Sequence, residues 1–148
     1  EMSTTAPAPS AVVARQFGMS DRAKARAAAE NIITAHPELD GMFASSEPSS
    51  VGAALAIKSR GLSGRLRYVA FDAAEATVED LKAGTVDALV AQDPFRIGYE
   101  AVRTLVDRLN GKTPPRLLNL DARVVTRADL DRPDVKALLF PDLRRYLK

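Results

Sequence analysis

The chain has 148 residues, a formal net charge of +2, one histidine and no cysteine. The lack of cysteine excludes disulfides, thiolate zinc sites and cysteine nucleophiles, and a single histidine, His36, excludes a multi-histidine metal cluster. The charge is a small excess among 21 basic and 19 acidic residues, and only 5% of residues are aromatic, so the composition does not predict a nucleic-acid surface. We therefore expect no metal, no cofactor and no nucleic-acid partner.

Residues 1–10 (EMSTTAPAPS) are rich in Thr, Ala and Pro, and they predict a flexible lead-in. They contain no basic region followed by an apolar stretch, so they do not have the pattern of a signal peptide. No segment of the chain approaches the roughly 20 apolar residues that a membrane-spanning helix requires.

Apolar periodicity then predicts strands and helices in alternation. The predicted strands cover residues 11–16, 41–45, 66–71 and 85–91, with a further extended segment at 117–125. The predicted helices run from the N-cap Ser20 to Pro37, from Pro48 to Gly61, from Ala74 to Ala83 and from Pro94 to Asn110, with short turns over 127–148. This alternation is typical of βαβ units in a mainly parallel sheet with right-handed crossovers.

Ligands of such sheets bind outside the carboxyl ends of the strands. The polar side chains that follow the first four predicted strands are Arg15, Ser20, Ser46, Glu47, Asp72 and Gln92. Carboxylates, amides and hydroxyls donate and accept in pairs, which suits the vicinal hydroxyls of a small polar ligand. The set contains neither a histidine base nor a glycine-rich phosphate loop, so we expect a binding site and no enzyme.

Most of these residues also have a structural interpretation, whereas Gln92, between a buried strand and a turn, is harder to explain by structure alone. Ser46 or Glu47 is equally well explained as the cap of the helix that begins near Pro48, and Asp72 as the cap of the following helix. A solvated charge at a strand end accounts for Arg15. We interpret Asp93, which precedes Pro94, as an N-cap and not as a ligand contact.

Several short motifs occur in a defined order along residues 11–148. They are DRAKA at 21–25, AHPELDGMFA at 35–44, VAFD at 69–72, KAGTV at 82–86, VAQDPF at 90–95, GK at 111–112, VVT at 124–126 and DVKALL at 134–139, followed by PDL at 141–143 and YL at 146–147. In this order and spacing the chain resembles the C-terminal part of the ribose-binding-like sugar-binding proteins of bacterial ABC transporters. Members of that family bind a monosaccharide between two α/β lobes joined by hinge strands.

The resemblance implies an α/β fold with a three-layer, doubly wound, mainly parallel sheet, in an incomplete periplasmic-binding-protein-like lobe. It assigns residues 11–93 to the C-terminal ligand-binding lobe, 94–126 to a helix and strand that return to the N-terminal lobe, and 127–148 to a C-terminal hinge segment. It implies a periplasmic location, an ABC permease as a partner and carbohydrate uptake as the function. An alternative function with the same fold is that of the effector-binding domain of a sugar-responsive transcription regulator.

The resemblance also assigns ligand contacts. Asp72 and Gln92 stand where the family has sugar-binding residues. Ser46 stands in place of an Asn, Glu47 in place of an Asp, and Ser20 in place of a stacking aromatic ring. Much of a complete member is absent, including a strand between residues 11–16 and 41–45. The apolar stripe of the helix 94–110 therefore needs another partner, which we expect to be a separate N-terminal lobe or a second copy of the chain.

Overall fold

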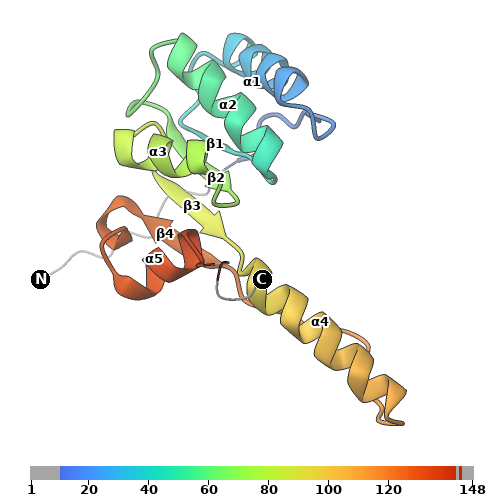
Figure 1. Ribbon diagram of the computed structural model, residues 1–148. Helices are drawn as coiled ribbons and strands as arrows, with labels where there is room; N and C mark the ends of the chain where they lie inside the picture. The colour runs from blue at the N-terminus through green and yellow to red at the C-terminus, as the bar shows by residue number, and fades with distance from the viewer. Residues whose placement is uncertain (1–10, 143, 145–148) are drawn as a thin grey trace, which may run out of the picture.

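The computed structural model describes residues 11–142 and residue 144 (Figure 1). The predicted lead-in at residues 1–10 and most of the C-terminal end, including residues 146–147 of the resemblance, lie outside the described residues. The strands are β1 (Gly41–Phe43), β2 (Arg67–Phe71), β3 (Ala88–Ala91) and β4 (Arg123–Thr126). The helices are α1 (Arg22–Ala35), α2 (Glu47–Ser59), α3 (Glu75–Ala83), α4 (Pro94–Leu109), the 3-10 turn η1 (Arg127–Asp129) and α5 (Pro133–Leu139).

The four strands form one sheet in the order β1-β2-β3-β4. The first three strands are parallel, with Phe43 opposite Val69 and Phe71 opposite Val90, and β4 runs antiparallel to β3. The expected extended segment at 117–125 forms a strand only from Arg123 onward. The prediction of a mainly parallel α/β sheet is confirmed.

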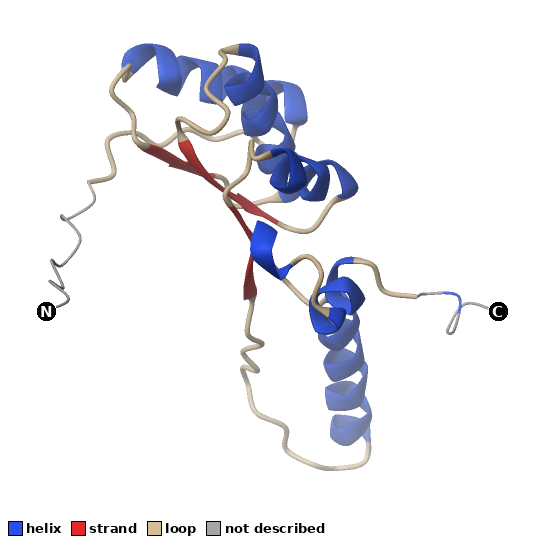
Figure 2. Cartoon of the chain, turned by 90° about the vertical axis from the view of Figure 1, so that its left-hand side faces the viewer, coloured by secondary structure: helices blue, strands red, loops and turns tan. Residues whose placement is uncertain are grey.

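One face of the sheet carries the hydrophobic core. The side chains on this face come from all of the longer strands and are at most 1% exposed: Tyr68, Ala70, Leu89, Ala91 and Val125. They pack against buried residues of α2, α3 and α5, such as Ile57, Leu81 and Val135. Figure 2 shows helices along one side of the sheet and one long helix, α4, extending away from it.

The opposite face of the sheet is apolar and open. It is formed by Phe43, Val69, Phe71, Val90 and Val124. Phe43 and Val124 are 58% and 63% exposed, and the Phe43 and Phe71 rings meet edge to face at 6.5 Å. The expected third layer is therefore missing from the described part of the chain. Successive strands advance in one direction across the sheet, so right-handed crossovers place α2 and α3 on the same face.

Helices α1 and α2 pack closely because small residues meet between them. Ala25 and Ala29 of α1 are buried against α2, and a Cβ on Gly52 would lie 2.6 Å from the carbonyl oxygen of Arg22. The cap of α1 differs from the prediction by one residue. Asp21, and not Ser20, is the N-cap, and its carboxylate accepts a hydrogen bond from the backbone N–H of Lys24 at 2.8 Å.

The predicted strand at residues 11–16 is wrong, because these residues form neither helix nor strand. Val12, Val13 and Phe17 are 71%, 55% and 86% exposed. A β-strand requires a neighbouring strand for its backbone hydrogen bonds, and within the described residues β1 pairs only with β2. The β-branched pattern alone does not supply that partner.

Helix α4 extends away from the sheet and the other helices (Figure 1). None of its residues is buried, and its apolar stripe lies open to solvent, with Val102 at 63%, Leu105 at 59% and Leu109 at 77% exposure. This exposure is consistent with the expectation that the stripe needs a partner. Among the described residues no helix is both long enough and apolar enough to cross a membrane.

Candidate functional site

Three of the six predicted site residues follow neighbouring parallel strands. Ser46 comes after β1, Asp72 directly after β2 and Gln92 directly after β3. Parallel strands end at one edge of the sheet, so these residues lie at the same edge. Backbone hydrogen bonds continue past the strand ends, since the N–H of Asp72 donates to the carbonyl of Val90 at 3.0 Å. The structure therefore places these three of the six predicted residues at one edge of the sheet.

Asp72 has the most unusual backbone of this group. Its φ angle is +67°, in the left-handed region that few residues other than Gly, Asn and Asp adopt. The side chain is half-buried, and no donor in the described part of the chain is hydrogen-bonded to its carboxylate. A charged acceptor held at a strand end by an unfavourable backbone conformation is a feature of binding sites.

Ser46 and Glu47 begin α2. Ser46 is the N-cap by its backbone position, but its side chain caps no backbone N–H and instead donates to Oγ of Ser49 at 3.0 Å. The carboxylate of Glu47 forms an ion pair with the guanidinium of Arg22. Ser46 therefore occupies the N-cap position of α2, but its side chain does not cap the helix. Glu47 must break or share its ion pair to contact a ligand.

The other predicted residues are less constrained. Gln92 is exposed, and the neighbouring Asp93 caps α4 as expected, accepting a hydrogen bond from the N–H of Arg96 at 2.9 Å. Ser20 lies in an exposed turn with φ of +53°, and Arg15 is exposed in the segment that forms no strand. Because the first predicted strand is absent, the strand-end argument no longer brings Arg15 and Ser20 to the site.

Two buried hydroxyls beside Asp72 were not predicted as part of the site. Ser50 and Thr77 are both 0% exposed. The hydroxyl of Ser50 is hydrogen-bonded to the backbone of Phe71, and that of Thr77 donates to the carbonyl of Asp72 at 2.9 Å. In the sequence, each of these residues is a polar residue at a helical position that faces the core. Periodicity shows such a residue only as an interruption of an apolar helix face, so it does not predict a role at the site.

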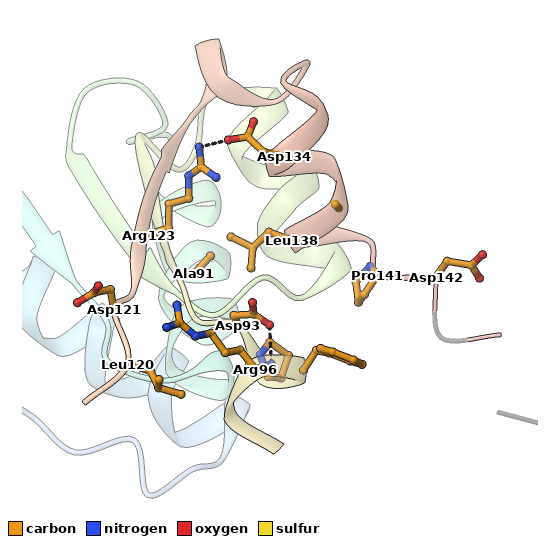
Figure 3. A pocket seen from close by; sticks show the side chains of 13 residues that line it. Ala91, Asp93, Arg96, Leu120, Asp121, Arg123, Asp134, Leu138, Pro141 and Asp142 are labelled. Carbon is orange, nitrogen blue, oxygen red and sulfur yellow. Dashed lines mark hydrogen bonds and ion pairs between the residues drawn. The ribbon is translucent and has the colours of Figure 1, made fainter. Parts of the chain in front are cut away.

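A cavity of about 440 Å³ adjoins the end of β3, between the start of α4, β4 and α5 (Figure 3). It is lined by Asp93, Arg96, Asp121, Arg123 and Asp134 together with apolar residues, and none of the six predicted residues lines it. Arg123 pairs with Asp134 at 2.7 Å, and this hydrogen bond, with that from Arg132, lowers the pKa of Asp134 to about 2. Among the described residues, Arg123 and Asp134 are the charged lining residues that pair with each other.

Comparison with known proteins decides the family. Residues 5–113 match the periplasmic binding protein domain. The chain belongs to this family. A ribose import binding protein of Bacillus subtilis is 29% identical over 116 residues, and the D-allose-binding periplasmic protein of Escherichia coli is 30% identical over 105 residues. The resemblance inferred from the sequence is confirmed at the level of the family.

Solved structures of the periplasmic binding protein family agree with this fold. An ABC transporter solute-binding protein of Agrobacterium vitis, bound to α-D-tagatopyranose, matches 87% of this chain with a TM-score of 0.82 and 30% identity. A second from the same species, bound to D-fucose, matches 86% with a TM-score of 0.80 and 30% identity. The chain covers 43% and 44% of these two proteins, and 37% and 34% of the ribose and allose relatives. It therefore spans less than half the length of the proteins that it matches.

Proposed function

We propose that this chain forms the ligand-binding part of a periplasmic sugar-binding protein that serves an ABC uptake system. The observation that carries the proposal is the half-buried side chain of Asp72, which has a φ angle of +67° at the carboxyl end of β2, the same edge of the sheet at which Ser46 and Gln92 follow their strands. The names of the relatives support uptake over the regulator alternative, because they are import and periplasmic binding proteins. The role is binding and presentation of a solute, without catalysis.

The chemistry of the group suits sugar hydroxyls. An ionised carboxylate accepts from two hydroxyls at once, and the amide of Gln92 both donates and accepts. Ser46 supplies a hydroxyl that donates a hydrogen bond to Oγ of Ser49. A serine at position 20 provides no ring to stack on a pyranose, so we expect recognition by hydrogen bonds to dominate.

A monosaccharide panel tests the proposal on the chain. Sugars named for the relatives, namely ribose, allose, xylose, tagatose and fucose, are added singly while thermal unfolding is followed. A bound sugar at a hundred times its Kd stabilises the folded state by about 2.7 kcal/mol, which raises Tm by roughly 5–10 °C for a protein of this size. No shift with any monosaccharide contradicts sugar binding by this chain.

Substitution of Asp72 locates the site. Asp72→Ala should weaken the affinity for the sugar by about 5- to 150-fold, because removing one partner of a buried polar contact costs about 1–3 kcal/mol. Asp131→Ala is the matched control, since that carboxylate is fully exposed in the turn between η1 and α5 and forms an ion pair with Lys136. Equal affinities of the two variants by isothermal titration would place the sugar elsewhere.

We also propose that the folded chain has a protein partner. Two apolar surfaces are open, namely the stripe of α4 and the sheet face around Phe43 and Val124. A separate N-terminal lobe or a second copy of the chain would cover them, and the complete assembly would dock on an ABC permease. Light scattering should show an assembly larger than one chain, or a monomer that binds a hydrophobic dye. A monomer that binds no such dye contradicts the need for a partner.

A further inference from the structure

The side chain of Ser50 makes an unusual pair of contacts with the end of β2. Its hydroxyl accepts a hydrogen bond from the backbone N–H of Phe71 at 2.8 Å and donates to the carbonyl of the same residue at 2.9 Å. Ser50 is fully buried in the first turns of α2, and its own carbonyl accepts a hydrogen bond from the hydroxyl of Tyr68 at 2.8 Å. One side chain therefore holds both polar backbone groups of the residue that precedes Asp72.

The backbone of Asp72 is held from the other directions as well. Its N–H donates to the carbonyl of Val90 on β3 at 3.0 Å. Its carbonyl accepts a hydrogen bond from the buried hydroxyl of Thr77 at 2.9 Å, and the same hydroxyl reaches the carbonyl of Ala74 at 2.8 Å. The peptide groups on both sides of Asp72 are thus tied to α2, β3 and α3.

This arrangement explains how Asp72 keeps a φ angle of +67°. The left-handed conformation is unfavourable for a residue with a Cβ and persists only where the surroundings hold it. Ser50 and Thr77 supply that constraint through hydrogen bonds from their side chains to the backbone of Phe71 and Asp72. Neither hydroxyl is needed to cap its own helix, because Ser46 and Ala74 occupy the N-cap positions.

We infer that Ser50, assisted by Thr77, is a positioning residue that sets the direction of the Asp72 carboxylate for ligand binding. The inference rests on the proposed function of Asp72. Ser50 is fully buried and does not touch the ligand itself. It acts only through the backbone of Phe71 and Asp72, so its contribution to affinity should disappear when the Asp72 carboxylate is absent.

A double-mutant cycle on sugar affinity tests this dependence. Ser50→Ala should weaken binding by fivefold or more in the wild-type chain and by less than twofold in the Asp72→Ala background. Ser59→Ala, which removes a hydroxyl that donates to the carbonyl of Ala56 at the far end of α2, should leave affinity unchanged. Equal losses from Ser50→Ala in both backgrounds would show a general effect on folding and overturn the inference.

A second double-mutant cycle measures stability and needs no ligand. It therefore tests the role of Ser50 even if the chain binds no sugar. Asp72→Gly should raise the midpoint of urea unfolding, because glycine adopts φ +67° without strain. In the Ser50→Ala background the increase in the urea midpoint should be smaller. Without the Ser50 hydroxyl, the backbone of Asp72 can leave the left-handed conformation, so glycine relieves less strain. An equal gain in both backgrounds overturns the inference whether or not a sugar binds. If Ser50→Ala does not fold, Thr77→Val removes the other hydroxyl with little change in shape.

Discussion

Two helical glycines should respond to the same substitution in opposite ways. In Gly52→Ala, the added Cβ would lie 2.6 Å from the carbonyl oxygen of Arg22, 2.8 Å from Cβ of Ala25 and 2.8 Å from the backbone nitrogen of Arg26. Carbon atoms in comfortable contact are about 3.5–4.0 Å apart, so the overlap is roughly 1 Å. Two of the three atoms belong to the α1 backbone, which therefore has to move as a whole.

The expected cost follows from two opposing effects. Overpacking of a tight core contact costs about 1–3 kcal/mol, and occasionally more. Replacing glycine by alanine inside a helix returns up to about 1 kcal/mol through helix propensity. Because backbone atoms set the clash, we expect the upper part of the range to apply and the free energy of unfolding to fall by about 2 kcal/mol. For a chain of this length that corresponds to a Tm lowered by roughly 4–8 °C.

Urea unfolding followed by circular dichroism measures this change. Gly98→Ala in α4 is the control, because nothing lies within 4 Å of its added Cβ and the same propensity gain applies. The control should show unchanged or higher stability, with the same dependence on urea as the wild type. A Gly52→Ala variant as stable as the wild type would refute the close approach of α1 and α2.

Two further predictions concern single contacts. Tyr68→Phe removes a buried hydroxyl that donates to the carbonyl of Ser50 at 2.8 Å, so chemical unfolding should show a loss of about 0.5–1.5 kcal/mol, whereas Tyr99→Phe at an exposed position should show none. The pKa of Asp134 is about 2 in the folded chain, below its ordinary value of 3.8, because of hydrogen bonds from Arg123 and Arg132. Its stabilising contribution is therefore complete above about pH 4 and lost as the pH falls toward 2. An acid titration of the Asp134→Asn variant should lack this part of the transition, and an unaltered titration would contradict the assignment.

The candidate site could be predicted in outline because strand ends are local features. An apolar run followed by Asp72 or Gln92 predicts a polar residue at the carboxyl end of a strand, and parallel strands bring such ends together. The positive φ of Asp72 could not be predicted, since aspartate also fits an ordinary helix cap. The contact of Ser50 with the backbone of Phe71 could not be predicted either, because the two residues are 21 positions apart in the sequence.

Other expectations depended on partners that local pattern does not reveal. The β-branched residues at 11–16 favour a strand, yet a strand forms only where a neighbour accepts its backbone hydrogen bonds. The ion pair of Glu47 with Arg22, which lies on a different helix, was likewise not predicted, and the role of Glu47 as a ligand contact stays a prediction. In both cases the missing information was the identity of the neighbouring segment.

The sequence by itself determined the helices, the parallel strands, the family and the exposed apolar stripe of α4. These follow from periodicity, helix signals and motif order, which are properties of short segments. Only the tertiary structure decided that α2, α3 and α5 pack on one face of the sheet and that the buried hydroxyls of Ser50 and Thr77 bond to the backbone of Phe71 and Asp72. The physical reason is that both depend on strand order and on hydrogen bonds between distant residues, which form only when the chain is packed.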